Sequence, residues 1–433
     1  GMSVYYTNST AYPTSITKLL SVNYYDNYPS DSPTRPTSIF SINTLPNASY
    51  SNISLKGLPT ASYINNIEND AWTKTYTWYD GKARAIGSHS INYLGGYTKT
   101  ETELDFAGVP QKTYTYHKRL STDTEIIIKE RFEYDNQNRL VKHWHNVNNA
   151  ANDELLTFNE YNELGQLKNK KVGGTTGSQL QSVDYRYNIR GWMTGINLDA
   201  TGNVQTNKLF SYKISYQEPL QITTTKPYLV NQSLEVKPKY NGNISEVTWF
   251  SGTDSTEPIK KYGYVYDGLN RLTAGFYYKK SGTSYLFTEE NNEIPEYDLN
   301  GNISKLKRFA YLVGTTPNKI DDLAYTYTGN RLTNLSDAGN SSGYENASTL
   351  PIQYDSNGNM TVMPGKKIQN VSYNFLNLPD SFNLGSRNTS NNLYRADGIK
   401  IRKHNTQLNI GINGSVIDNT IIDYLDGFQY KLT

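Results

Sequence analysis

The stretch YDGLNRLTAGFYY, residues 266–278, combines a turn pattern with strand patterns on both sides. Tyrosines alternate in YGYVY just before the turn, and apolar residues alternate in LTAGF just after it. A period of two places such side chains on one face of a β-strand. A near-copy, YDNQNRLVKHW, begins at Tyr134. The stretch therefore predicts a β-hairpin that the chain uses more than once.

The pattern Tyr-Asp/Asn-x-x-Gly/Asn recurs along most of the chain. Full-length copies begin at Tyr79, Leu104 (in place of Tyr), Tyr134, Tyr161, Tyr187, Tyr266, Tyr297, Tyr354, Tyr373 and Tyr394, and shortened copies begin at Tyr240 and Tyr327. The usual step is roughly 26 residues, and a step about twice as long after Tyr187 predicts a degenerate copy near Tyr212 or Tyr216. This spacing predicts an array of about 12–13 repeat units.

The motif has the chemistry of a hairpin turn. The Asp or Asn in its first turn position can accept backbone N–H bonds, and the Gly or Asn in its fourth suits a positive φ at a bulge. In the shortened copies, Asn241-Gly242 and Gly329-Asn330 suit two-residue turns. The predicted structural turn residues are Tyr134, Asp135 and Asn138; Tyr266, Asp267 and Asn270; Tyr297, Asp298 and Gly301; and Tyr354, Asp355 and Gly358.

The composition favours a thin sheet over a compact core. The 433 residues include 38 tyrosines against 12 phenylalanines, and only 36% of the chain is hydrophobic. Tyr and Thr suit half-exposed strands, whereas Asn and Gly suit tight turns. No window holds an apolar stripe of helical period, so helix is expected to be scarce. The predicted fold class is all-β, with YD-repeat β-hairpins forming a curled, spiralling antiparallel sheet.

Three segments are expected along the chain. Residues 1–71 hold a Pro/Ser/Asn-rich stretch and are predicted to be irregular, with a possible role as a cap. Residues 72–430 hold the repeat array, and residues 431–433 are expected to be a truncated tail before a missing core or C-terminal domain. Gly1-Met2 is typical of a cloning remnant on a piece of a longer protein, so the absence of a signal peptide says nothing about location.

These repeats resemble the YD repeats of bacterial Rhs proteins, which also occur in insecticidal toxin complexes and in teneurins. The resemblance covers roughly residues 72–430 and is carried by YDGLNRL, YDLNGNI, YDSNGNM and YRADGIKIRK. It implies a spiralling antiparallel sheet, which in long members of the family is a hollow shell around a C-terminal toxin. It also implies a following core segment that plugs the shell and, in many members, releases the toxin by cleavage with aspartates.

The sequence departs from that family pattern near its end. It stops at YLDGFQYKLT, about where the core segment is expected, and no core protease motif or toxin domain is recognisable. The number of units also favours a short, open spiral over a large closed shell.

No residue pattern predicts catalytic, cofactor-binding or metal-binding residues. Asp298, Asn300 and Asn302 are spaced like the start of an EF-hand loop, but the Gly and Glu required later in that loop are missing. His143 and His145 alternate around Trp144 and could share a metal only with a third ligand from elsewhere. Turn chemistry and an exposed histidine pair explain these residues without a metal. The chain has no cysteine and neither a Gly-x-Ser-x-Gly nor a His-Glu-x-x-His motif.

Three functions remain open from the sequence. The first is a non-enzymatic scaffold, exported or at the cell surface, that encapsulates or presents a C-terminal core or toxin domain. The second is an adhesin-like module that binds glycans or neighbouring cells through exposed aromatic residues, and the third is a degradative enzyme. A net charge of +2 without a basic run indicates neither nucleic-acid binding nor membrane insertion. The chain is expected to be a monomer without a cofactor.

Overall fold

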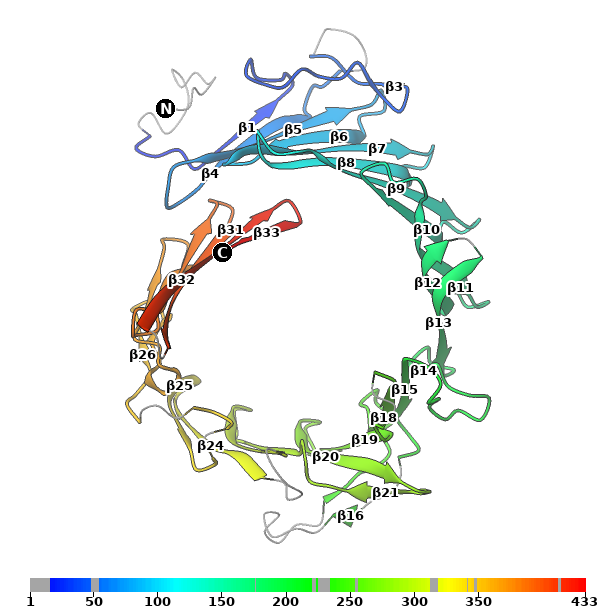
Figure 1. Cartoon of the computed structure of the whole chain (residues 1–433), viewed down its shortest axis with the longest axis vertical. Coiled ribbons are helices and arrows are strands. Elements are labelled where there is room, and N and C mark those ends of the chain that lie inside the picture. Colours follow the sequence, from blue (N-terminus) through cyan, green and yellow to red (C-terminus); the bar gives the residue numbers. More distant parts are fainter. Residues whose placement is uncertain are drawn as a thin grey trace. The chain divides into compact units, whose positions relative to one another are not determined.

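The computed structural model describes residues 16–47, 54–175, 177–219, 223–224, 234–253, 256–311, 318–340, 342–345, 349–411 and 414–433. Within these ranges the protein is almost entirely antiparallel β-structure, and 21 strands belong to one sheet (Figure 1). The single helical element there is the short 3-10 helix η1, Pro364–Lys366. None of the described helices is long and apolar enough to cross a membrane. The predicted all-β, antiparallel fold with very little helix is confirmed, whereas the spiral curl stays a prediction.

The chain divides into two compact units. The first contains residues 1–158, 172–180 and 370–433, and the second contains residues 159–171 and 181–369. The first unit holds the sheet strands β1 Ser21–Tyr25, β4 Pro59–Asn65, β5 Trp72–Tyr79, β6 Ala85–Ile91, β7 Gly95–Leu104, β8 Pro110–Leu120, β9 Ile126–Tyr134 and β10 Leu140–Val147. Three strands contribute residues to both units: β11 Glu154–Tyr161, β12 Leu167–Thr175 and β13 Ser178–Tyr187.

Strands β4 to β10 pair with one another in sequence order. Short turns join most of these strands, as expected when consecutive strands form hairpins. In each hairpin that follows the repeat motif, the register shifts by one residue beside the turn, for example between Glu103 and Leu104. A shift of this kind is a β-bulge. The turn pattern in the sequence thus produces the bulged hairpin that it predicts.

The expectation that residues 1–71 are irregular is wrong for part of the described segment. Strand β1 pairs with β4, and β4 pairs in turn with β5, so the sheet begins well before residue 72. These two strands lie more than thirty residues apart without a repeat turn between them, so the motif does not reveal them. Between them, the short hairpin of β2 Ser38–Ile39 and β3 Ile42–Asn43 packs Ile39 against Trp78 and Ile86. This part covers one face of the first repeats, as a cap does.

The C-terminal residues of the first unit form a separate six-stranded sheet. Its strands are β28 Asn370–Tyr373, β29 Pro379–Asn383, β30 Thr389–Tyr394, β31 Lys400–Gly411, β32 Gly414–Leu425 and β33 Phe428–Leu432. Each pairs with the next in the order of the sequence. Lys431 and Leu432 pair with Ile422 and Ile421, so the expected tail at 431–433 is instead largely the end of a strand.

The second unit continues the same hairpin design. Its sheet strands are β14 Met193–Ile196, β15 Phe210–Ser215, β18 Glu246–Ser251, β19 Lys260–Tyr266, β20 Leu272–Ser281, β21 Ser284–Phe287, β22 Glu293–Tyr297, β23 Ile303–Ala310, β24 Asn318–Thr328 and β25 Arg331–Asp337. Two short hairpins lie outside this sheet: β16 Thr223–Thr224 with β17 Leu234–Glu235, and β26 Gln353–Tyr354 with β27 Met360–Val362. Gly329 and Asn330 join β24 to β25 as the two-residue turn that the sequence predicts.

The hydrophobic core is distributed along the strands in small clusters. The largest lies in the second unit, where Phe276, Tyr278 and Phe309 are buried and the hairpin strand β21 packs Phe287 against them. In the first unit, buried Tyr63 and Tyr76 pack beside Val22 and Tyr24 from the N-terminal part. A repeat array of this kind buries apolar surface mainly between neighbouring units. The low apolar content of the sequence is sufficient for such a fold.

Candidate functional site: the repeat turns and the C-terminal clasp

In the repeat turns that begin with Asp, the carboxylate of that residue closes the turn. Asp267 Oδ1 accepts the backbone N–H groups of Leu269 and Arg271, both at 2.9 Å. Its Oδ2 accepts a bond from Arg271 Nε at 2.7 Å. Asp135 makes the same three bonds with Gln137 and Arg139. The backbone N–H bonds, together with the neighbouring guanidinium, hold the pKa of both carboxyl groups below its ordinary value.

Asn replaces Arg in the turns at Asp298 and Asp355. Asn302 donates its backbone N–H to Asp298 Oδ1 at 2.8 Å and its Nδ2 to Oδ2 at 2.9 Å. Asn359 makes the matching bonds to Asp355 at 2.8 and 2.9 Å. Both oxygens of each carboxylate therefore accept N–H bonds from the turn itself. This geometry explains the EF-hand-like Asp/Asn spacing through turn formation.

The fourth turn position has left-handed backbone in all four predicted turns. The φ angles are 58° at Asn138, 63° at Asn270, 88° at Gly301 and 86° at Gly358. Ala83, which departs from the sequence pattern, has φ 62°. Glycine adopts this region without strain, and Asn tolerates it better than most other residues. The choice of Gly or Asn therefore follows from the backbone of the turn.

The motif tyrosine connects its repeat to the one before it. Tyr266 donates its hydroxyl to the carbonyl of Ile244 at 2.8 Å, and Tyr134 donates to Pro110 at 2.8 Å. Each acceptor lies on the chain that leaves the preceding turn. The same bond is made by Tyr79 to Pro59, Tyr216 to Met193, Tyr327 to Ile303, Tyr354 to Leu332 and Tyr394 to Pro379. Tyr216 occupies the place where the sequence predicts a degenerate repeat.

Arginine at the fifth turn position links one turn to the next. Arg271 Nη1 donates to the carbonyl of Asp298 at 3.2 Å, and its Cζ lies 4.7 Å from the ring centre of Tyr297. In the first unit, Arg84 Nη1 donates to the carbonyl of Asp105 at 2.7 Å. This arginine is visible in the Asn-Arg-Leu triplets of the sequence. The carbonyl that it binds lies one repeat further along the chain. Sequence reasoning assigned no role to it.

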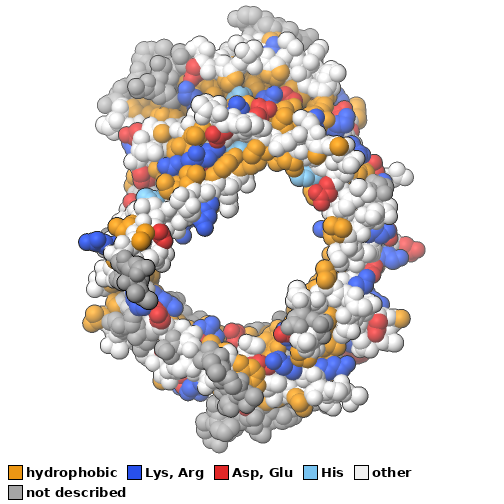
Figure 2. Space-filling model, in the orientation of Figure 1, with side chains coloured by type: hydrophobic (Ala, Val, Ile, Leu, Met, Phe, Trp, Pro, Cys, Tyr) orange, Lys and Arg blue, Asp and Glu red, His pale blue; other side chains and the backbone are white. Residues whose placement is uncertain are grey.

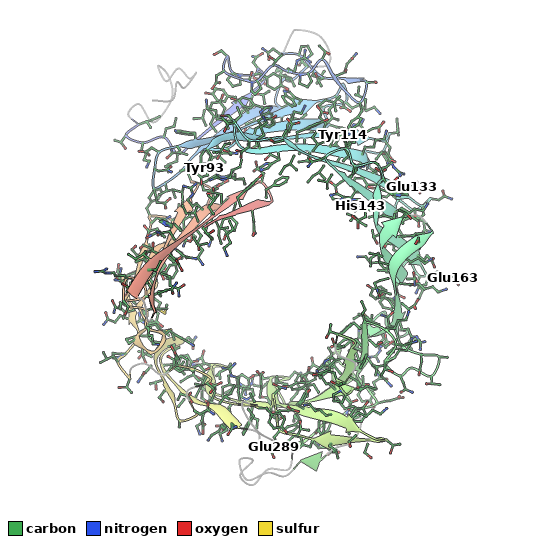
Figure 3. The ribbon with its side chains drawn as sticks, in the orientation of Figure 1. Tyr93, Tyr114, Glu133, His143, Glu163 and Glu289 are labelled. Carbon is green, nitrogen blue, oxygen red and sulfur yellow. The ribbon has the colours of Figure 1, made fainter. Side chains whose placement is uncertain are left out.

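The two candidate histidines belong to an ordinary strand pair. His143 Nε2 lies 2.8 Å from the carboxylate of Glu130, and the ring stacks on Phe132 at 4.6 Å between centres (Figure 3). His145 is opposite Glu130 in the register of β9 and β10. Within the described ranges no three His, Asp or Glu side chains surround a possible metal position. Contacts within the strand pair, to the carboxylate of Glu130 and the ring of Phe132, thus explain the position of His143.

A cleft of 640 Å³ opens beside His145 and Glu130 in the first unit. Strands β5 to β8 line it with the hydroxyl side chains of Thr75, Ser88, Ser90, Thr98, Thr100 and Thr115. Phe428 and Asp426 from the β32–β33 turn complete the wall. Several of these hydroxyls bond across the strands, as Ser88 does to Thr100 at 2.6 Å. The wall of the cleft thus combines hydroxyl side chains with the apolar side chains of Ile128, Leu156 and Phe428.

A buried polar cluster, which we call the C-terminal clasp, joins Asp423 and Arg402 of the C-terminal sheet to Arg119 of β8 and to Tyr93 in the turn before β7. Asp423 is fully buried and accepts bonds from Arg402 Nε at 2.6 Å, Arg119 Nε at 2.9 Å and the Tyr93 hydroxyl at 3.0 Å (Figure 3). Burial alone would raise the pKa of Asp423, but the bonds from the two arginines hold it below its ordinary value. Asp423 and Arg119 lie 304 positions apart in the sequence. No spacing pattern could have paired them.

The structure thus defines a class of protein: a β-hairpin repeat array whose turns are locked within and between repeats. No known family and no curated protein matches the sequence. Among solved structures, the chain is similar to the complex of TcdB2, TccC3 and Cdc42, with 13% identity, a TM-score of 0.47, and coverage of 90% of this chain and 20% of that one. The chain is also similar to the structure of TcdB2-TccC3-TEV, with 13% identity and a TM-score of 0.47. The match covers 88% of this chain and 20% of that one.

A third similar structure is the Tc holotoxin pore of Photorhabdus luminescens with a TccC3 mutation. It is 12% identical, has a TM-score of 0.31, and is matched over 88% of this chain and 24% of that one. The chain spans about a fifth of the length of the first solved chains that it matches.

Proposed function

We propose that this chain is a non-enzymatic structural scaffold, an exported or cell-surface YD-repeat segment that encapsulates or presents a C-terminal core, toxin or effector domain. The observation that supports this function is the use of the motif's polar side chains. The Asp, Arg and Tyr groups bond to backbone and to one another, so the repeated residues build and join hairpins. Repeats built in this way form an extended surface. The ionisable side chains of the motif make structural hydrogen bonds within it.

The scaffold function is tested on the natural reading frame. The protein is purified with whatever domain follows residue 433, and limited proteolysis measures how fast that domain is digested. We expect slow digestion with the intact array and fast digestion after the array is weakened by replacing Asp80 and Asp423 with Ala. Asp80 closes the turn after Tyr79 by accepting bonds from the backbone of Lys82 and from the backbone and side chain of Arg84. The free downstream domain serves as the control. Equal digestion in all three proteins, or a reading frame without a further domain, contradicts the proposal.

The non-enzymatic part has its own test. We expect no hydrolysis of generic ester, glycoside or peptide substrates, because the acidic residues of the turns accept structural bonds. Robust turnover that is abolished by one Asp or Glu substitution contradicts this expectation. The matched control replaces an exposed acid at the surface, such as Glu296, which should leave any background turnover unchanged.

A second candidate function, glycan binding by an adhesin-like surface, is favoured by a row of stacked rings in the second unit. Tyr262 is stacked with Trp249 at 6.2 Å and with Tyr264 at 5.7 Å between ring centres. Phe210, 43% exposed, is stacked with Tyr212 at 6.0 Å. In Figure 2 hydrophobic and charged side chains are interspersed over the visible face, without a large region of one charge. Neutral ligands such as glycans suit this distribution.

Glycan-array binding separates the two candidates. Under the adhesin function, replacing Phe210 and Tyr264 with Ala should abolish binding. Replacing Phe106, which is 89% exposed at a repeat turn in the first unit, should leave binding unchanged. If the protein binds no glycan on the glycan array, the adhesin function is contradicted and the scaffold function remains.

A further inference from the structure

The hairpin of β32 and β33 lies against β7 and β8 in the first unit, and its contacts there include a buried histidine. The side chains that meet are Asp423, Phe428 and Tyr430 from the hairpin, and Arg119 and His117 from β8. We propose that this hairpin is an acid-sensitive latch, which is closed when His117 is neutral and released when His117 is protonated.

His117 is completely buried beneath the hairpin. Its ring is parallel to that of Phe428, with 1° between the planes and 3.8 Å between the centres, and Tyr430 stacks at 5.7 Å. Nδ1 lies 2.8 Å from the hydroxyl of Thr98 on β7, the register partner of His117. Nε2 is buried and has no hydrogen-bond partner among the described residues. This environment accommodates a neutral imidazole.

Protonation requires both ring nitrogens to carry hydrogen. The N–H at Nε2 would then be buried without an acceptor, and the charge would be placed on a side chain that is removed from water. Burial accordingly lowers the pKa of His117, although the carboxylates of Asp426 and Asp123 act in the opposite direction. Arg119 faces the same side two residues along β8 and shares the carboxylate of Asp423 with Arg402, so these three groups together keep a positive charge. The closed hairpin therefore disfavours the imidazolium.

The clasp at Asp423 permits release of the hairpin without leaving a buried charge unpaired. Arg402 and Asp423 are register partners on β31 and β32, so this ion pair stays within the C-terminal sheet when the hairpin moves away. Arg119 and Tyr93 belong to the other sheet and become exposed to water. The desolvation cost that normally follows when one partner of a buried pair is removed is thereby avoided.

A second contact between the two sheets can serve as a hinge. Ile67 donates its backbone N–H to the carbonyl of Tyr394 at 2.9 Å, and Ala396 donates to Asn65 at 2.8 Å. These backbone bonds do not depend on a titrating side chain. The β32–β33 hairpin has side-chain contacts to β8 instead, and these can be lost while the base of the sheet stays attached.

The direction of the pH effect follows from linkage. In the released hairpin His117 regains its ordinary pKa of 6.5, and in the closed hairpin burial lowers the pKa. The closed state is thus favoured above pH 6.5, and its population decreases as the pH falls below that value. One proton changes the closing equilibrium by at most about tenfold per pH unit. Because the released His117 is already half protonated at pH 6.5, the change between pH 6.5 and about pH 5 is up to about 16-fold.

A single thiol measures the opening directly, because the chain contains no cysteine. Leu425 is 3% exposed and lies two residues from Asp423, on the same face of β32. In the Leu425→Cys protein, labelling by 4,4′-dithiodipyridine is compared with labelling of an unfolded peptide that carries the same cysteine. We expect the relative labelling rate to rise by up to about 16-fold from pH 6.5 to about pH 5.

Two histidine variants in the Leu425→Cys background decide the cause. His117→Gln cannot be protonated, so its relative labelling rate should not change with pH in this range. His404→Gln, in strand β31 and bonded only to Asn419 in its own sheet, should keep the full rise. A pH-independent rate with His117 present, or a rise that survives in His117→Gln, overturns the proposal. A loss of β-structure by circular dichroism in both proteins at about pH 5 overturns it as well.

Discussion

Gly358 tests whether backbone conformation selects Gly or Asn in the repeat turns. Its φ is 86°, and a Cβ built at this position meets no atom within 4 Å. A Val at 358 therefore has space, and its cost comes from forcing a β-branched residue into the left-handed region. This strain should be about 1–3 kcal/mol. Gly358→Asn should be mild, since Asn138, Asn270 and Asn377 already occupy this position with φ between 56° and 63°.

Hydrogen exchange of peptides from residues 349–363 is the appropriate assay, because unfolding of a repeat array need not be two-state. A strain of 1–3 kcal/mol corresponds to roughly 5- to 150-fold faster local exchange. Gly268→Val is the matched control, since Gly268 also has open space in a turn but lacks a positive φ. If Val at 358 is tolerated as well as Asn, or if Gly268→Val costs as much, the backbone explanation is refuted.

Three further measurements test other parts of the account. Far-UV circular dichroism should show mainly β-structure and less than about 10% helix, and a helix share near one third would contradict the fold. Adding millimolar calcium or a chelator should leave Tm unchanged, because a cation bound only to the folded state would raise it. Asp423→Asn should lower the free energy of unfolding at neutral pH by about 3 kcal/mol. The pKa of Asp423 is depressed from 3.8, so its contribution is present above that pH and disappears below it. In urea titrations the variant should therefore approach the wild type as the pH falls below 3.8, and a constant difference would contradict this assignment.

The turns could be predicted from the sequence because their determinants are local. Asp267, Asn270 and Arg271 lie within five residues, and a backbone of fixed geometry brings their groups together. The alternation of the tyrosines predicted strands and gave no role to their hydroxyl groups. Their hydroxyl bonds were missed because the acceptor is a backbone carbonyl some 20 residues upstream, which no residue type marks.

The N-terminal strands and the C-terminal clasp were missed for a different reason. Strand β1 joins β4 across a stretch without the repeat motif, and β4 begins at Pro59, which weakens a strand pattern. Asp423 and Arg119 are 304 positions apart and meet only in the tertiary structure. A single sequence has no signal for such a pair, whereas covariation among related sequences could reveal it.

The central claim is that motif tyrosines such as Tyr266 tie their own hairpin to the preceding one. Tyr266→Phe removes one hydroxyl and keeps the ring, and hydrogen exchange of the whole chain locates the effect. The account predicts faster exchange both around the turn at residues 266–272 and around Ile244, the acceptor in the preceding repeat, with residues 95–134 unchanged. Unchanged exchange near Ile244 would contradict the claim.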